Sequence, residues 1–296
     1  MHVRAPTAPL LQARARARER TRVRPRAAGG DRGIPAVLVT GASSGIGEAC
    51  ARRLVSLGWD VYASVRVPGQ APEGTRELVF DIRDVVATTH ALATIESLDA
   101  VVANAGIAIA APLEFLPEQE LTRQLDVNVV GQFRVVQPVL PLLRRSRGRV
   151  VLMGSIGGRS ALPFLGAYAM SKFALEAFAD SLRIEVAPWG MHIAIVEPGT
   201  IATAIWTKPQ RALDEFPPEA AELYGARIES FRRLAAARSS KGVPAEEVAK
   251  AVEHALTSPK PRTRYLVGSD ARKRARVQRL PDRLRDRLLT RFLFGS

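Results

Sequence analysis

A glycine-rich turn between an apolar run and a helical pattern constrains the fold of this 296-residue chain more than any other feature. Residues 34–59 read IPAVLVTGASSGIGEACARRLVSLGW, with Gly41, Gly45 and Gly47 in the turn. Such glycines let the backbone approach a pyrophosphate and let the helix pack on the sheet, while the helix amino terminus favours negative charge. The spacing is G-x-x-x-G-x-G rather than G-x-G-x-x-G, and a purely structural turn is the alternative. We predict a dinucleotide site on a parallel α/β sheet.

Further short apolar runs predict the rest of that sheet. The expected strands are residues 61–65, 78–80, 98–103, 150–153, 190–196 and 264–267, and the expected helices include residues 117–144 and 245–256. Arg66 follows the second strand, about twenty residues beyond the turn, where an acidic residue would bind a ribose 2′-hydroxyl and an arginine accommodates a 2′-phosphate. NADP(H) is therefore favoured, with NAD(H) and a solvated loop arginine as the alternatives.

Polar residues follow two of the other strands. Asp81-Ile82 and Asn104-Ala105-Gly106 lie where strands of an open parallel sheet end, which is the edge that binds ligands. Asn128 lies in the middle of the long helix among apolar residues, so we expect its amide to have a specific role. A residue that caps a bulge is the alternative.

Three reactive side chains occur within the stretch GSIGGRSALPFLGAYAMSK, residues 154–172. Ser155 follows an apolar strand, and Tyr168 and Lys172 share one face of the helix that comes next. A free tyrosine has a pKa of about 10, and a nearby ammonium group lowers it. Tyr168 would then exchange a proton with a carbonyl or hydroxyl oxygen that Ser155 binds. Taken alone, an ordinary turn serine, helix tyrosine and surface lysine are an equal alternative.

Together these segments resemble the short-chain dehydrogenase/reductase family over residues 34–268. The resemblance rests on TGASSGIG at residues 40–47, NAG at residues 104–106, Asn128, Ser155, Tyr168-x-x-x-Lys172 and Pro198-Gly199-Thr200. It implies a Rossmann-type, doubly wound parallel sheet of about seven strands in an α/β/α arrangement of three layers. It also implies reversible hydride transfer between NAD(P)(H) and a carbonyl/alcohol pair. The cofactor-binding positions that it implies are Gly41, Ser43, Ser44, Gly45, Ile46, Gly47, Arg66, Asp81, Ile82, Asn104, Ala105, Gly106, Tyr168, Lys172, Pro198, Gly199, Thr200 and Thr203.

The same resemblance assigns the catalytic roles. Tyr168 is the acid/base, Lys172 holds the ribose and lowers the tyrosine pKa, Ser155 orients the substrate oxygen, and Asn128 anchors a water in the proton relay. It further implies a homo-oligomer that pairs through the helices carrying Asn128 and Tyr168. A non-catalytic nucleotide-binding scaffold is the alternative of another class, and the complete catalytic set argues against it.

The net charge of +14 lies at the two ends of the chain. Residues 1–33 carry +7 and residues 259–296 carry +9, which leaves −2 for the middle. A nucleic-acid groove through the core is therefore not expected. We predict a disordered arm or over-long start at residues 1–33, with binding to nucleic acid or an anionic surface ranked second and organelle targeting third. The catalytic domain is predicted at residues 34–270.

The last 26 residues, 271–296, carry leucine or phenylalanine at every fourth position from Leu280, with arginines between. This pattern predicts a basic amphipathic helix, which would either lie on an anionic membrane or pack against the enzyme. No apolar run is long enough to span a bilayer, so we expect a cytoplasmic protein with peripheral membrane contact as the alternative. Cys50 is the single cysteine, which excludes an intrachain disulfide and a cysteine-rich metal site, and no metal is expected.

The substrate is expected to be a bulky apolar ketone or secondary alcohol of steroid, retinoid or lipid type. The region after Pro198 is rich in large apolar residues, namely Trp206, Phe216, Leu223, Tyr224, Ile228 and Phe231, which suggests a lid over the substrate. Core packing explains these residues equally well. A keto-acyl thioester or another carbonyl compound is the alternative substrate, and similarity to hydroxysteroid and retinol dehydrogenases favours the apolar one.

Overall fold

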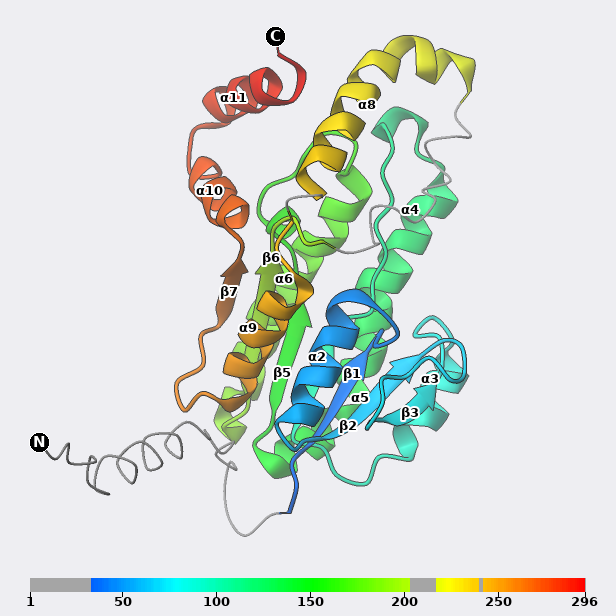
Figure 1. The fold of residues 1–296 in the computed structure, drawn as a ribbon, viewed down its shortest axis with the longest axis vertical. Coiled ribbons are helices and arrows are strands. Elements are labelled where there is room, and N and C mark those ends of the chain that lie inside the picture. Colours follow the sequence, from blue (N-terminus) through cyan, green and yellow to red (C-terminus); the bar gives the residue numbers. More distant parts are fainter. Residues whose placement is uncertain (1–32, 203–216, 240–241, 296) are drawn as a thin grey trace, which may run out of the picture.

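The computed structural model describes residues 33–202, 217–239 and 242–295. Within them, seven parallel strands form one sheet in the order β3-β2-β1-β4-β5-β6-β7 (Figure 1). The strands are β1 Ala36–Thr40, β2 Asp60–Val65, β3 Arg76–Val79, β4 Ala100–Ala103, β5 Arg149–Met153, β6 His192–Pro198 and β7 Arg264–Val267. The order reverses beside β1, between β1 and β4, which is the topological switch point where such sheets bind ligands. The predicted doubly wound fold is confirmed.

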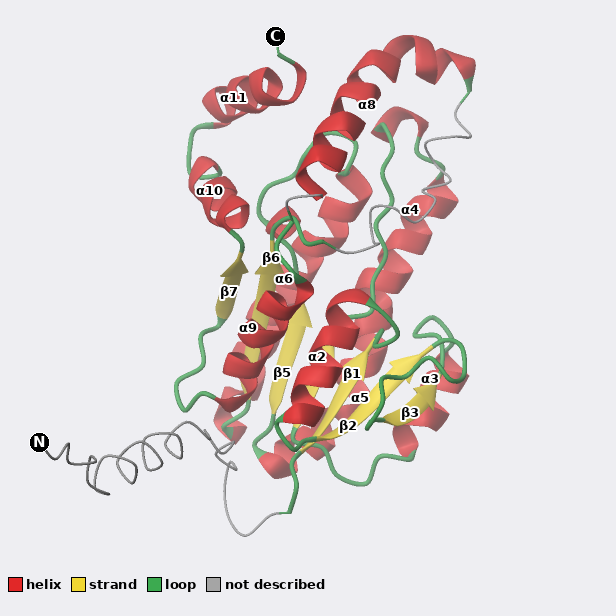
Figure 2. Cartoon of the chain, viewed as in Figure 1, coloured by secondary structure: helices red, strands yellow, loops and turns green. Residues whose placement is uncertain are grey.

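Alternation along the strands builds two hydrophobic cores, one on each face of the sheet. Val37 and Val39 of β1 pack with Cys50 and the helices α2 and α9, whereas Leu38 faces the opposite core, formed with α3, α5 and α6. The α-helices are α2 Gly45–Ser56, α3 Val85–Ala93, α4 Glu118–Leu125, α5 Gly131–Ser146, α6 Gly166–Val186, α8 Pro218–Ser239, α9 Ala245–Thr257, α10 Ser269–Val277 and α11 Asp282–Phe294. Figure 2 shows the resulting helix, sheet and helix layers.

The predicted long helix is present but is interrupted by one π-helical segment. The segment η3, Asp126–Val130, joins α4 to α5 without a break in the right-handed backbone. Asn128 is at its centre and is fully buried. A π-helical turn widens the helix locally and commonly marks a functional site.

The C-terminal segment differs from the single amphipathic helix that the sequence predicted. It forms two helices, because Pro281 stands at the N-cap of α11 and separates it from α10. α11 packs against α8, and both helices lie beyond the carboxyl ends of the strands (Figure 1). α10 begins at Ser269, inside the predicted catalytic domain, and packs against β7.

The described helices include none long and apolar enough to cross a bilayer. Of the terminal arm predicted at residues 1–33, only Gly33 belongs to the described residues.

Candidate active site

The glycine turn forms a narrow cradle between the ends of β1 and β4. Gly41 has a left-handed backbone with φ of +66°, and a side chain there would meet the backbone of Ala105 at 2.9 Å. A side chain at Gly47 would overlap the carbonyl oxygen of Gly41. The turn delivers the chain to the amino terminus of α2, where Ser44 is the N-cap residue and its hydroxyl makes no capping bond. The backbone donors at this helix end suit a pyrophosphate.

Asn104 braces that cradle from the neighbouring strand. Its amide nitrogen Nδ2 donates to the carbonyl of Thr40 at 2.9 Å, and its backbone N–H donates to the Thr40 hydroxyl, also at 2.9 Å. The backbone N–H of Ala105 donates to the same hydroxyl at 3.0 Å. The predicted Asn104-Ala105-Gly106 segment is thus fixed to the end of β1 by hydrogen bonds between its backbone and Thr40.

Asn128 holds the loop that follows. Its Oδ1 accepts from the backbone N–H of Ile107 at 2.9 Å, and its Nδ2 donates to the Ile107 carbonyl at 2.9 Å and to Ser171 Oγ at 3.0 Å. The Ser171 hydroxyl in turn donates to the carbonyl of Tyr168 at 2.7 Å. The buried amide therefore ties the Ile107 loop to the helix that carries the tyrosine. Its role in anchoring a water remains a prediction.

Two further amides take part that the sequence analysis missed. Gln124 Oε1 accepts from the Ile109 N–H at 2.7 Å and its Nε2 donates to the Ile107 carbonyl at 2.9 Å, while Gln132 Nε2 donates to the Ala105 carbonyl. Gln124, Asn128 and Gln132 recur every four residues, so they form one buried polar stripe along the helix. The four-residue spacing of these amides was the signal in the sequence that could have indicated their role, because amides buried on the apolar face of a helix need hydrogen-bond partners.

Ser155, Tyr168 and Lys172 meet at the carboxyl end of β5. All three are buried, with 8%, 8% and 5% of their surfaces exposed. Ser155 Oγ accepts from the Gly157 N–H at 3.0 Å as the N-cap of the 3₁₀ segment η4, Ile156–Gly158. Lys172 Nζ donates to the Met153 carbonyl at 2.7 Å and lies 5.7 Å from the centre of the Tyr168 ring. The structure thus brings together the three residues that the sequence placed in the catalytic group.

Burial is the main influence on the pKa values of Tyr168 and Lys172. It raises the pKa of Tyr168, an effect that the Ser155 hydroxyl and the charge of Arg274 partly oppose. It lowers the pKa of Lys172 to about 8. The sequence analysis expected Lys172 to lower the pKa of Tyr168. The protein residues alone do not produce a lowered pKa, and the residues that act in that direction are Ser155 and Arg274 rather than Lys172.

The adenosine side of the predicted site lies at the ends of β2 and β3. Arg66 is exposed directly after β2, and Asp81 forms an ion pair with Arg83 at 2.8 Å, which holds the pKa of the Asp81 carboxyl below its usual value. Ile82 is buried against Gly131 of α5. Arg66 is thus open to a ligand phosphate, whereas Asp81 already has a partner.

The segment after β6 lies at the same carboxyl edge of the sheet. Gly199 N–H donates to the Val267 carbonyl at 2.9 Å, and Thr200 N–H donates to Asp270 Oδ2 of α10 at 2.7 Å. Thr203, Trp206 and Phe216 lie outside the described residues.

An aromatic cluster lies at the turn that precedes Tyr168. Phe164, four residues before Tyr168, has its ring centre 5.7 Å from that of Phe231, 6.3 Å from that of Tyr224 and 6.3 Å from that of Phe294. Of the aromatic residues predicted to form a lid, Tyr224 and Phe231 therefore pack on the Phe164 ring from α8. Leu223 of the same helix is exposed.

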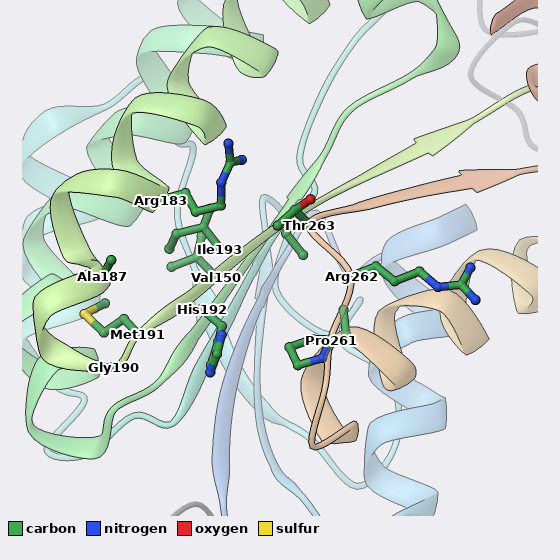
Figure 3. A pocket seen from close by; sticks show the side chains of 12 residues that line it. Val150, Arg183, Ala187, Gly190, Met191, His192, Ile193, Pro261, Arg262 and Thr263 are labelled. Carbon is green, nitrogen blue, oxygen red and sulfur yellow. The ribbon is translucent and has the colours of Figure 1, made fainter. Parts of the chain in front are cut away.

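A hollow of about 240 Å³ lies at the opposite end of the sheet. Val150, His192 and Ile193 line it where β5 and β6 begin. Its two arginines, Arg183 and Arg262, extend away from each other (Figure 3). The hollow is therefore remote from the catalytic group and has no convergent polar set.

The fold and this site define an oxidoreductase acting on CH–OH groups with a dinucleotide cofactor. The chain belongs to the short-chain dehydrogenase family, whose model matches residues 35–214. It is 37% identical to human 17-beta-hydroxysteroid dehydrogenase type 1, over 77% of this chain and 76% of that protein. It is 32% identical to the NADPH-dependent 3-dehydrocapnine reductase of Ornithobacterium rhinotracheale, over 85% and 94% of the two chains. A solved short-chain dehydrogenase from Streptomyces avermitilis superposes with a TM-score of 0.71 at 28% identity, covering 89% of this chain and 98% of that one.

Proposed function

We propose that this protein transfers hydride reversibly between NADP(H) and a bulky apolar ketone or secondary alcohol. The observation that carries the proposal is the buried group of Ser155, Tyr168 and Lys172 beside the glycine cradle. When bound, the nicotinamide supplies or accepts the hydride. Ser155 binds the substrate oxygen, and the Tyr168 hydroxyl delivers its proton to that oxygen or removes it.

Lys172 acts from behind the tyrosine. The Met153 carbonyl fixes its ammonium group, whose remaining protons would hold the ribose of the cofactor. Asn128 and Ser171 hold the backbone of Tyr168 in place. The active geometry is therefore set by the protein before the substrate arrives.

The exposed guanidinium of Arg66 supports the choice of NADP(H), because it is a bidentate partner for a 2′-phosphate at the end of β2. The related 3-dehydrocapnine reductase is NADPH-dependent, which agrees with this choice. NAD(H) is the alternative cofactor.

The cluster around Phe164 supports an apolar substrate, since it places four aromatic rings next to the turn that leads into Tyr168. The relation to a hydroxysteroid dehydrogenase agrees with a steroid, retinoid or lipid-like compound. A keto-acyl thioester is the alternative.

The test is a steady-state screen of NADPH oxidation with steroid ketones, retinal, long-chain ketones, keto-acyl thioesters and sugars. We expect the highest kcat/KM for one of the apolar ketones. A clear preference for a sugar or a short polar ketone would refute the apolar pocket, and turnover of none would favour the scaffold alternative.

We also propose a homo-oligomer that pairs through α4, α5 and α6. Phe133 and Phe173 are each 44% exposed, and Met170 of α6 and Val130 of η3 are also exposed. Phe173→Glu places a charge in that surface and should convert the oligomer to a monomer by light scattering, whereas Ile184→Glu, at a position 73% exposed farther along α6, should not.

Peripheral contact with an anionic lipid surface is proposed for α11. Its residues Leu284, Leu288 and Phe292 recur every four positions and are exposed, with arginines between them. Sedimentation with phosphatidylserine vesicles tests this contact, and no difference from phosphatidylcholine vesicles would refute it.

A further inference from the structure

The helix α10 reaches the catalytic group from the C-terminal segment. Asp270, in its first turn, accepts from the Thr200 N–H at 2.7 Å and thereby docks the helix on the segment after β6. One turn later, Arg274 Nη2 donates to the carbonyl of Ser160, in the loop between Ser155 and Tyr168. The second contact joins α10 to the loop that leads to Tyr168, and the charge of Arg274 acts to lower the pKa of that tyrosine.

Arg274 is a partly buried cation that forms no ion pair with a described carboxylate. Its Nε is shielded from solvent and makes no hydrogen bond, and no described carboxylate forms an ion pair with it. Burial lowers its pKa to about 10, with the charge of Asp270 acting against that change. A buried guanidinium that lacks a counter-charge is costly, so a partner that binds there gains the interaction.

A second arginine indicates that such a partner would carry negative charge. Arg238 of α8 is close enough to lower the pKa of Arg274 further, and its guanidinium lies 4.6 Å from the centre of the Phe292 ring. Arg238 is thus a second positive charge near Arg274, on the helix that packs against α11. Such a pair is unfavourable unless an anion lies between or beside them.

We propose that Arg274 forms an anion-binding subsite next to Tyr168, and that the substrate is an apolar carbonyl compound that also carries a carboxylate. This inference rests on the reductase function proposed above and specifies its substrate class. The rings around Phe164 bind the apolar body, Ser155 and Tyr168 take the carbonyl oxygen, and the guanidinium pairs with the carboxylate. The Tyr168 phenolate is a weaker candidate for the partner, because burial keeps the hydroxyl protonated in the resting protein.

The experiment compares oxo acids of increasing chain length with their methyl esters, as substrates of the full-length protein with NADPH. The wild type should show a kcat/KM at least about tenfold higher for the acid than for the ester at one chain length or more. In Arg274→Met, which keeps much of the side-chain length, that ratio should fall to about one, and Arg274→Lys should restore part of it. Arg272→Met is the matched control, because it removes an exposed charge from the same helix and should leave the ratio unchanged.

Calorimetric binding of decanoate and decanamide separates this inference from the reductase function, since it needs no turnover. Wild type should bind decanoate about tenfold more tightly than decanamide, and Arg274→Met should bind the two alike. The subsite is overturned if the ratio of kcat/KM for acid over ester is one or less in the wild type, whatever the variants do. It is also overturned if Arg272→Met lowers that ratio as much as Arg274→Met does. If no carbonyl compound is reduced but the decanoate preference depends on Arg274, the subsite stands and the reductase function fails.

Discussion

Glu176 and Glu197 contact the same guanidinium in the interior, with Arg264 Nε 3.1 Å from Glu176 Oε2 and 3.5 Å from Glu197 Oε1. Glu176 is one helical turn beyond Lys172, and Glu197 precedes the Pro198-Gly199-Thr200 segment, so the pair lies directly behind the active site. Burial, followed by the charge of Glu197, raises the pKa of Glu176 to about 7. The Glu176 carboxyl is therefore partly protonated at neutral pH.

This pair should make the folded protein less stable as the pH rises. Between an unfolded pKa of about 4.5 and a folded pKa of about 7 the native state binds more protons, so the free energy of unfolding falls with rising pH over that window. Thermal melts from pH 5 to pH 8 should show a decrease of a few degrees attributable to this group. Glu176→Gln should reduce the dependence of the melting temperature on pH. An unchanged dependence would show that Glu176 does not bind a proton in this pH range.

Replacement of Tyr168 by phenylalanine should abolish turnover and leave cofactor binding largely intact. The variant removes the transferable proton while the ring and the Ser171 contact to its backbone remain. We expect a loss of about 10²-fold or more in kcat, as for other general acid–base groups. The dissociation constant for NADPH, measured by fluorescence, serves as the control. A variant that keeps more than a few per cent of wild-type kcat would refute the assignment.

Arg66→Asp should reverse the cofactor preference. The aspartate repels a 2′-phosphate and accepts a hydrogen bond from a 2′-hydroxyl, so kcat/KM should fall for NADPH and rise for NADH. Arg76→Asp, at another exposed position in the neighbouring strand β3, should change neither value by more than about twofold. Equal wild-type values for the two cofactors would contradict the role given to Arg66.

Gln124→Leu should destabilise the loop that borders the active site. The variant leaves the buried N–H of Ile109 without its acceptor, which costs about 1–3 kcal/mol of unfolding free energy. We expect a lower urea midpoint together with a higher KM for the cofactor, because the loop begins at the Asn104-Ala105-Gly106 segment. Gln137→Leu, on the exposed side of α5, is the control and should leave both unchanged. A normal midpoint for Gln124→Leu would show that the loop does not depend on this amide.

The sequence was sufficient for the parts that depend on short-range patterns. Short apolar runs located the seven strands to within about two residues, because the strands of this parallel sheet are buried on both faces. The glycine cradle and the Ser155, Tyr168 and Lys172 group were also predictable, since their geometry follows from one turn and one helix face.

Tertiary packing alone decided the remaining features. The Arg274 and Ser160 contact joins residues 114 positions apart, and the approach of Glu176 to Glu197 depends on the placement of α6 against β6. The C-terminal pattern was compatible with a membrane surface or with the enzyme, and only the packing of α11 on α8 shows where its inner face lies. Amphipathic periodicity indicates that a helix has an apolar face. Contacts between segments far apart in the chain determine what that face packs against and which polar groups are buried beside it.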